Sequence, residues 1–460
     1  MPKTQLMTVI LAAGKGTRMV SDIPKVCHAL GGRPMLAYVL DAARQLESVK
    51  IVTVIGPEMP EVESVVEEFS TTYDLKVETV IQEAQQGTGH ALMATRQHLE
   101  NFSGAVLVLF GDTPLITHST LEKLINLKNL APAPTIVLMG IRPDDPLRYG
   151  RIVLDANGDV EAIIEHADAT AEQLKNPLCN SGAMLIDGKA LLGLLVQLTC
   201  DNANNEYYLT DLVKIANLQG LRVALVEAQA DELAGINTRQ DLAAAEKILQ
   251  NRWRGQAMAK GATLIDPETV FFSYDTQLGR DVKIEPNVIF GPGVLVHNQV
   301  TIRAFCRIEG ALIEDNAIVG PFAHLRPETH IGQKVRIGNF VEVKKSKIRE
   351  GAKVNHLSYI GDCDVGARTN IGAGTITCNY DGFQKFRTVI GEQVSIGANT
   401  SLIAPVEIGN KAVIGAGSVI TRKVASDSLA YSRAPQQELV GGGARYRRKH
   451  SKLKIIPKKV

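Results

Sequence analysis

The stretch Ile390–Ile420, IGEQVSIGANTSLIAPVEIGNKAVIGAGSVI, decides the fold of the second half of the chain. An aliphatic residue stands at every sixth position of it: Ile390, Ile396, Leu402, Ile408, Ile414 and Ile420. A helix would need a period of 3.6 residues and an ordinary strand a period of two, so neither explains this spacing. A period of six is typical of a β-helix, in which three short strands form each triangular coil.

The same spacing occurs in two earlier runs: Val288, Val294, Val300, Cys306, Leu312 and Ile318, and then Ile331, Ile337 and Val343. We expect these side chains to point into the prism, with small residues at its corners. The spacing falls to five between Ile360 and Val365, and the pattern breaks between Ile371 and Ile390. Thr377–Val389 is therefore expected to loop out, and loops on a rigid scaffold often carry function.

The first half of the chain has a different texture, in which short apolar runs alternate with amphipathic segments. The expected strands are Thr8–Leu11, Ile51–Ile55, Ala105–Phe110, Thr135–Ile141 and Arg222–Val226, and the expected helices are Pro34–Leu46, Gly89–Glu100 and Ser119–Asn129. This alternation predicts a Rossmann-like α/β domain with a largely parallel sheet that is covered on both faces. Helical spacing over Thr238–Lys260 predicts a connecting helix that ends at Gly261.

The chain has 460 residues, which is more than one hydrophobic core usually supports. We expect an α/β domain over residues 1–236, a linker helix over 237–260, a β-helix over 261–436 and a basic tail over 437–460. The left-handed winding of the β-helix is implied by its resemblance to known hexapeptide-repeat proteins, because the usual crossover preference is right-handed.

Eight basic residues and no acid lie in the tail: Arg445, Arg447, Arg448, Lys449, Lys452, Lys454, Lys458 and Lys459. Such an end is either a solvated, partly disordered segment or one attracted to a phosphorylated ligand. The net charge of the chain is +1, so the remainder is acidic on balance, and we expect no nucleic-acid partner. The six cysteines form no C-x-x-C pair, and no apolar stretch nears 18 residues. We therefore expect free thiols, no membrane partner and a cytoplasmic location.

The first predicted strand runs into a glycine-bearing loop, LAAGKGTRM over Leu11–Met19, which is followed by Pro24-Lys25. Such a turn at the carboxyl edge of a sheet lets backbone N–H groups approach phosphates. Arg18 and Lys25 can neutralise a triphosphate, and Asp112 ends an apolar strand where a carboxylate suits Mg²⁺. Asp112 has the alternative role of a turn carboxylate, and Asn237 that of an N-cap of the connecting helix.

In this full form the motif resembles the sugar-phosphate nucleotidylyltransferases. The resemblance implies that UTP and the UDP-sugar contact Leu11, Ala12, Ala13, Gly14, Lys25, Gln82, Gly87, Thr88, Phe110, Gly111, Asp112, Gly150, Glu165, Asn180 and Asn237. It implies that Asp112 and Asn237 hold Mg²⁺ and that Arg18 and Lys25 act in catalysis. The chemistry is attack of a sugar-1-phosphate on the α-phosphorus, with pyrophosphate leaving.

A second polar cluster interrupts the repeats: Arg326, Lys344, His356, Tyr359, Asn370, Asn379 and Tyr380. His356 is the candidate base, because an imidazole titrates near neutral pH. The alternative for His356 is a surface histidine without a role.

Over Met7–Gln436 the chain resembles the bacterial bifunctional N-acetylglucosamine-1-phosphate uridyltransferase/glucosamine-1-phosphate N-acetyltransferase family, through LAAGKGTRM, QGTGHA, GNFVEVKK, NIGAGTITCNYDG and SRAPQ. The resemblance implies that His356 is the base and that Glu342 orients it. It implies that glucosamine-1-phosphate contacts Arg326, Lys344, Tyr359, Asn370, Asn379 and Tyr380. It implies that acetyl-CoA contacts Ala373, Asn379, Tyr380, Ala398, Ala416 and Arg433. A homotrimer through the β-helix is implied as well. The sequence departs from the family pattern at Phe110, Ser181, Asn355 and Ala398.

Two functions other than the bifunctional enzyme are compatible with parts of the sequence. One is a single-activity nucleotidylyltransferase with a structural or regulatory β-helix, which would carry no base or anion-binding cluster in its repeats. The other is a non-catalytic regulatory or assembly protein, which would have lost Arg18, Lys25 or Asp112, although all three are present.

Overall fold

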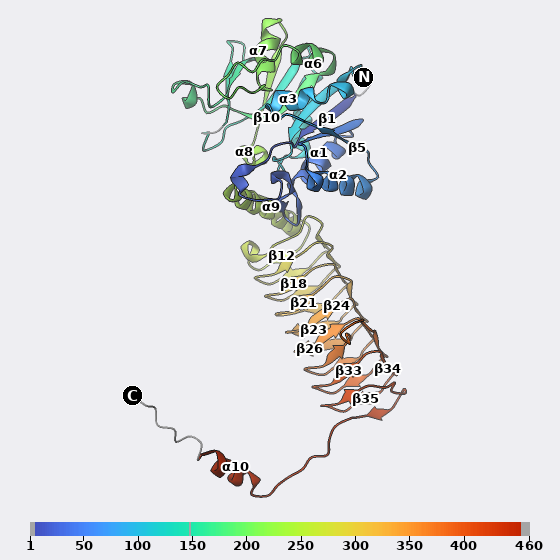
Figure 1. Cartoon of the computed structure of the whole chain (residues 1–460). Helices are drawn as coiled ribbons and strands as arrows, with labels where there is room; N and C mark the ends of the chain where they lie inside the picture. Colours follow the sequence, from blue (N-terminus) through green and yellow to red (C-terminus); the bar gives the residue numbers. More distant parts are fainter. Residues whose placement is uncertain (1–4, 147–148, 452–460) are drawn as a thin grey trace, which may run out of the picture. The chain divides into compact units, whose positions relative to one another are not determined.

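The computed structural model describes residues 5–146 and 149–451, and the chain forms two compact units that divide between Gly255 and Gln256 (Figure 1). Four of the predicted basic tail residues, Lys452, Lys454, Lys458 and Lys459, lie outside the described residues. The other four lie in an exposed helix, α10 (Gly442–Ser451). Over the described ranges, no helix is both long and apolar enough to cross a bilayer.

The first unit is built on one sheet, with strand order β11-β7-β10-β6-β1-β4-β5. Its strands are β1 (Leu6–Leu11), β4 (Lys50–Ile55), β5 (Val77–Ile81), β6 (Ala105–Phe110), β7 (Ile136–Ile141), β10 (Cys179–Asp187) and β11 (Val223–Ala228). The pairs are parallel except for β10, which runs antiparallel to both of its neighbours in this order. A hairpin of β8 (Arg151–Leu154) and β9 (Val160–Ile164) branches off β10, where Arg151 pairs with Cys179. The expected α/β sheet is confirmed, with these antiparallel exceptions.

Helices cover both faces of this sheet. The first apolar layer contains α1 (Met35–Gln45), α2 (Pro60–Tyr73) and α5 (His118–Lys128). The second contains α3 (Thr88–Met93), α4 (Arg96–Leu99), α6 (Gly188–Leu195) and α7 (Asp211–Leu218). Strand β1 shows why two layers form: Ile10 packs into the first and Val9 and Leu11 pack into the second, since neighbouring strand residues face opposite ways.

The helix expected over Gly89–Glu100 is in fact two helices, α3 and α4. The break lies at Thr95, whose buried hydroxyl donates a hydrogen bond to the Leu92 carbonyl at 2.7 Å. The Thr95 amide donates to the same carbonyl at 3.1 Å. A threonine that bonds back to the preceding turn competes with the α-helical ladder, and here it ends α3.

The connecting helix α9 spans Arg239–Ala259. Its start is a reciprocal cap, in which the Asp241 amide donates to Thr238 Oγ1 at 3.1 Å and the Asp241 carboxylate accepts from the Thr238 amide at 2.8 Å. Thr238 therefore fills the capping role, which leaves the Asn237 side chain for other contacts. Gly261, at a φ of 100°, follows the helix where a left-handed residue is expected.

The second unit is a left-handed β-helix of three parallel sheets (Figure 1). The first sheet holds β12 (Thr263–Leu264), β14 (Lys283–Ile284), β17 (Thr301–Ile302), β20 (Ile318–Val319), β23 (Arg336–Asn339), β26 (Lys353–His356), β29 (Asn370–Ile371), β32 (Ser395–Ile396), β35 (Val413–Ile414) and β37 (Leu429–Ala430). The second holds β15 (Ile289–Phe290), β18 (Arg307–Ile308), β21 (His324–Leu325), β24 (Glu342–Lys344), β27 (Tyr359–Gly361), β30 (Ile376–Cys378), β33 (Ser401–Ile403) and β36 (Val419–Ile420). The third holds β13 (Gln277–Leu278), β16 (Leu295–Val296), β19 (Ala311–Ile313), β22 (Thr329–Ile331), β25 (Lys347–Ile348), β28 (Cys363–Val365), β31 (Thr388–Ile390) and β34 (Val406–Ile408).

The inward-facing residues differ in part from the expected series. Val288, Val294, Val300 and Cys306 are buried as expected, but Leu312 and Ile318 are only half-buried, and Ile313 and Val319 are the fully buried residues. Each side of a coil buries two residues that are two positions apart, such as Val288 and Phe290, so two six-residue series coexist. The side of the coil before Ile313 is one residue shorter than most other sides. Leu312 therefore still follows Cys306 by six residues, but it faces outward. Shorter sides precede Ile348 and Val365 as well, all on the third sheet.

The excursion after β30 is confirmed but is shorter than expected. Thr377 belongs to β30, where its buried hydroxyl accepts a hydrogen bond from the Gly361 amide at 2.7 Å, and Val389 belongs to β31. The excursion therefore covers residues 379–387. Its second end is tied to the third sheet by an Arg387–Asp364 ion pair of 2.7 Å.

Paired substitutions at neighbouring positions test this register. Ile313→Ala removes a fully buried side chain and should destabilise the β-helix by about 2–5 kcal/mol. Leu312→Ala should cost no more than about 1 kcal/mol, because that side chain is partly solvated. Denaturant unfolding of the β-helix measures both values, and equal losses would contradict the register.

Candidate active sites

A cavity of about 290 Å³ opens at the carboxyl ends of β1 and β6. It brings together ten of the residues predicted to contact the nucleotide: Leu11, Ala12, Ala13, Gly14, Lys25, Gln82, Gly87, Thr88, Phe110 and Asp112. Val26, Gln85 and Ala91 line it too, although the sequence reasoning did not select them. Gln85 donates a hydrogen bond to the Ala13 carbonyl and so steadies the loop. Gly111 lies between two lining residues in the chain.

The glycine loop is folded so that Lys25 comes close to it. Gly16 has a φ of 65°, and a Cβ added there would lie 2.4 Å from the Lys25 Cβ. Only glycine permits this approach, which brings the residue before the short helix Thr17–Met19 against the first residue of the short helix Lys25–Cys27. These two helices carry Arg18 and Lys25, so the loop itself positions both predicted cations.

The two predicted metal ligands converge on one point. Lys25 Nζ forms an ion pair with Asp112 and donates to Asn237 Oδ1 at 3.0 Å, while Arg18 donates to the same oxygen at 2.8 Å. The segment that carries Asn237 is held to the end of β6, because the Ile236 amide donates to the Asp112 carbonyl at 2.9 Å. Asp112 therefore belongs to the charged cluster of the site and is not only the carboxylate of a turn.

These contacts also test whether the residues fit a divalent cation. Two oxygens within reach of one ammonium group lie close enough together to share a small cation, and hard oxygen donors suit such an ion. In the described parts of the chain there is no group of three or more His, Cys, Asp or Glu side chains arranged for a metal. The pair fits an ion that takes its other ligands from water and phosphate, as Mg²⁺ commonly does.

The segment that carries the predicted nucleotide contacts Gln82, Gly87 and Thr88 is fixed by hydrogen bonds and close packing. Gln82 is 3% exposed, and its side-chain amide nitrogen, Nε2, donates to the Gly87 carbonyl at 3.1 Å. The Gly89 amide donates to the Tyr207 carbonyl at 2.7 Å, and a Cβ on Gly87 would lie 2.7 Å from that carbonyl. The glycines are therefore needed for close packing beneath the nucleotide pocket.

Gly150, Glu165 and Asn180, which were predicted among the contacts of UTP and the UDP-sugar, also lie together. The Asn180 amide donates to the Gly150 carbonyl at 2.9 Å, and a Cβ on Gly150 would lie 3.3 Å from Glu165 Oε2. Burial raises the pKa of the Glu165 carboxyl, while the hydrogen bond that it accepts from Thr210, at 2.8 Å, lowers it. Thr210 was not predicted, because its contact with Glu165 spans 45 residues.

In the β-helix, one edge carries the predicted base and four of the six predicted acetyl-CoA residues, Ala373, Ala398, Ala416 and Arg433. Asn339 and His356 pair in register in β23 and β26. The paired strands β29, β32 and β35 place Ala373, Ala398 and Ala416 at the equivalent corner of later coils. Backbone hydrogen bonds connect this corner from coil to coil, as from the Asn399 amide to the Ala373 carbonyl at 2.7 Å. Arg433 donates to the Ala416 carbonyl at 2.6 Å, so it lies at the end of the same edge.

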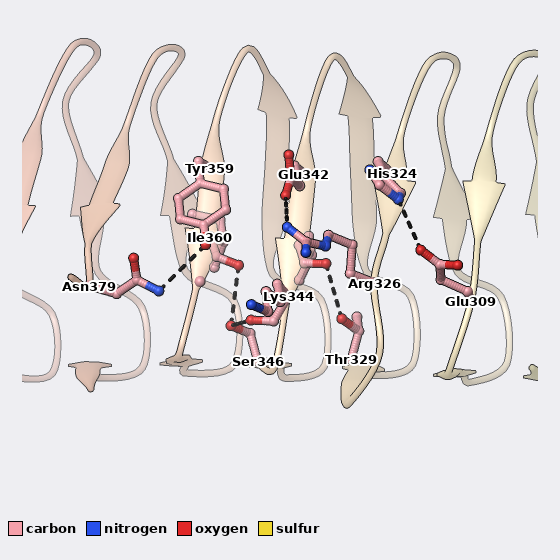
Figure 2. Close-up of polar contacts among 12 residues, drawn as sticks. Glu309, His324, Arg326, Thr329, Glu342, Lys344, Ser346, Tyr359, Ile360 and Asn379 are labelled. Atoms are coloured by element: carbon pink, nitrogen blue, oxygen red, sulfur yellow. Dashed lines mark hydrogen bonds and ion pairs between the residues drawn. The ribbon is translucent and has the colours of Figure 1, made fainter. Parts of the chain in front are cut away.

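The second sheet, beside this edge, carries two of the predicted sugar-phosphate residues, Lys344 in β24 and Tyr359 in β27, and Arg326 directly follows its strand β21. Figure 2 shows Arg326, then Glu342 together with Lys344, and then Tyr359 on successive coils, with a 2.8 Å ion pair between Arg326 and Glu342. The neighbouring Lys385 ammonium lowers the pKa of Lys344; desolvation and Arg326 act in the same direction, and Asp362 opposes them. Cations held this close together favour binding of an anion.

The excursion contributes two more of the predicted polar residues, Asn379 and Tyr380. The Asn379 side-chain amide donates to the buried carboxylate of Asp362. It also donates to Tyr359 Oη at 3.4 Å (Figure 2). Tyr380 follows Asn379 and is 60% exposed. Asn370 lies on β29 of the first sheet, and thus on a different side of the prism from Lys344. Asp362 and Lys385 were not predicted, although Lys385 falls within the predicted loop.

The expectation that Glu342 orients His356 is not what the structure shows. The Glu342 carboxylate is bound to Arg326, and His356 Nδ1 lies 2.8 Å from Asn339 Oδ1. Asn339 was missed because it is 17 residues from His356. The length of one coil was the signal that could have identified it.

The chain is similar to known proteins over both of its units. Residues 8–173 match the family model of the MobA-like NTP transferase domain, and residues 307–405 match that of the GMPPB C-terminal domain. The bifunctional protein GlmU of Paramagnetospirillum magneticum is 50% identical over 447 residues, which cover 97% of this chain and 98% of that protein. Those of Zymomonas mobilis and Rhodospirillum rubrum are 49% and 51% identical, each over 96% of this chain and 98% of the relative. The chain therefore belongs to the GlmU family of bifunctional proteins.

Proposed function

We propose that this bifunctional transferase makes UDP-N-acetylglucosamine in two steps. The β-helix transfers the acetyl group of acetyl-CoA to glucosamine-1-phosphate. The α/β domain then transfers a uridylyl group from UTP to N-acetylglucosamine-1-phosphate and releases pyrophosphate. The product would supply peptidoglycan and lipopolysaccharide precursor synthesis. Family membership over nearly the whole chain supports this assignment.

In the acetylation step, the sugar amine attacks the thioester carbonyl carbon, and the bond to sulfur breaks. His356 accepts the proton that the amine loses and passes it to the departing sulfur, so CoA leaves as the free thiol. Arg326, Lys344, Tyr359, Asn370, Asn379 and Tyr380 would bind the amino-sugar phosphate, and Ala373, Asn379, Tyr380, Ala398, Ala416 and Arg433 would line the acetyl-CoA site. The observation that carries this step is that the His356 corner and the three alanine corners lie on one edge.

In the uridylyl step, a phosphate oxygen of the sugar-1-phosphate attacks the α-phosphorus of UTP. The nucleophile is already anionic, so charge neutralisation and in-line positioning suffice. Lys25 and Arg18 would offset charge on the transferring phosphate. Asp112 and Asn237 would hold Mg²⁺, which when bound neutralises the triphosphate. The other predicted nucleotide and sugar residues would bind UTP and the sugar.

Two assays on the purified chain test this proposal. Glucosamine-1-phosphate and acetyl-CoA should give free thiol, and UTP with N-acetylglucosamine-1-phosphate and Mg²⁺ should give pyrophosphate. The second reaction should fail when the divalent ion is chelated. Thiol release without pyrophosphate, or the reverse, would reject the two-step assignment.

We further propose a cytoplasmic homotrimer that assembles through the β-helix. The free cysteines suit a reducing compartment. Phe305, Phe322 and Phe340 stack along one corner of successive coils and are 53%, 45% and 54% exposed, and such exposed apolar patches favour association. Light scattering should give a mass of three times 49.7 kDa, and a monomer would contradict this proposal.

A further inference from the structure

We infer that Asn339 is a positioning residue that sets the tautomer of His356. His356 Nδ1 lies 2.8 Å from the amide oxygen of Asn339, and that oxygen can only accept a hydrogen bond. Nδ1 therefore carries the proton, and Nε2 keeps the lone pair. Since the proposed function requires a neutral imidazole with a free lone pair, this inference rests on that function, and it assigns Nε2 as the atom that accepts the proton.

The backbone holds Asn339 in the place that this role requires. Strands β23 and β26 pair at this position, and the Leu357 amide donates to the Asn339 carbonyl at 3.1 Å. A Cβ on Gly338 would lie 2.0 Å from the Asn355 carbonyl oxygen, so only glycine lets β23 come this close. The Asn339–His356 contact is thus built by two paired strands rather than by a mobile loop.

A fixed hydrogen bond at Nδ1 has two effects on a base. It selects one of the two neutral tautomers, and it prevents rotation of the ring away from the substrate. The Glu342 carboxylate does not orient the His356 ring, because it is bound to Arg326. A neutral amide orients the ring without adding a negative charge beside it.

Two variants of nearly equal size separate orientation from packing. Asn339→Leu removes the acceptor and should lower kcat for thiol release by about 10–100-fold, the loss usual for a partner that orients a functional histidine. Asn339→Asp keeps an acceptor oxygen and adds a charge. It should recover most of the lost rate above neutral pH. Its carboxylate stabilises the imidazolium, so the acid limb of the kcat/KM profile should move up by about one pH unit.

The charged and titratable groups on the strands around His356 stay the same in both variants. A shift in the acid limb of the kcat/KM profile is therefore due to the change at position 339. On the first sheet these groups are Arg336 and Lys353, and on the second sheet they are Glu342, Lys344 and Tyr359. Strand β29, in the coil after His356, contributes the uncharged Asn370 and Ile371.

Nitrogen NMR of the full chain labelled with ¹⁵N-histidine gives a readout that does not depend on activity. His356 is assigned through His356→Gln, and its ring should be the Nδ1–H tautomer in the unmodified chain but not in Asn339→Leu. An Nε2–H tautomer in the unmodified chain, or unchanged spectra and pH profiles in both variants, would overturn the inference. The expected tautomer in a chain that does not acetylate glucosamine-1-phosphate would support the positioning role and reject the proposed function instead.

Discussion

His356→Ala should lower kcat for acetyl-CoA-dependent thiol release by about 10²–10⁴-fold, the usual contribution of a general base. The amino-sugar phosphate would still bind to Lys344 and Arg326, but no group would take the proton from its amine. Pyrophosphate release should be unchanged, because it occurs in the other compact unit. Both rates can be measured on a single preparation, so each reaction serves as the internal control of the other.

A matched histidine controls for the loss of an imidazole from the prism surface. His330 lies on the third sheet, where Nε2 contacts Glu314 at 2.7 Å. His330→Ala should acetylate at the unmodified rate. Normal acetylation by His356→Ala would show that the base has been wrongly assigned.

Asp112→Ala should lower the rate of pyrophosphate release by about 10²–10³-fold, the loss typical when one electrostatic stabiliser is removed. The carboxylate pairs with Lys25, and with Asn237 it is the proposed holder of Mg²⁺. Its removal frees the Lys25 ammonium and takes one oxygen from the ion. Thiol release should stay at the unmodified rate.

Asp231, which is exposed in the first turn of α8 (Ala230–Leu233), provides the control. Asp231→Ala removes a carboxylate from the same domain and should leave both reactions unchanged. Full pyrophosphate release by Asp112→Ala across a range of Mg²⁺ concentrations would reject the proposed ligand role.

The sequence predicted the architecture well where a single period dominates. The period-six pattern identified the β-helix, and the apolar runs identified five sheet strands of the α/β domain. The prediction was wrong at Leu312 and Ile318, because an outward position fell into step with an inward one after a shortened side. It was also wrong across Gly89–Glu100, where one threonine hydroxyl ends a helix that the apolar spacing would continue.

The candidate sites were predictable where a motif is continuous in the chain, as in the Leu11–Met19 loop. Contacts between coils were harder to predict. The pairs Asn339–His356 and Asp362–Asn379 are each 17 residues apart, and no local pattern connects their members. The sequence left open whether Asn237 caps the connecting helix. In the structure Thr238 is the cap, and its reciprocal contact with Asp241 can be recognised only in the folded backbone.

The in-register stacking of the coils bears on how such a chain can change in length. Duplication of a whole coil, such as the one from Lys283 to Val300, would lengthen the prism and leave the spacing between the Asn339, His356 and Ala373 corners unchanged. A single inserted residue within a side would instead turn the following inward positions outward until another corner absorbed it. Evolution of this domain is therefore expected to proceed by whole-coil steps, with single-residue changes confined to corners and excursions.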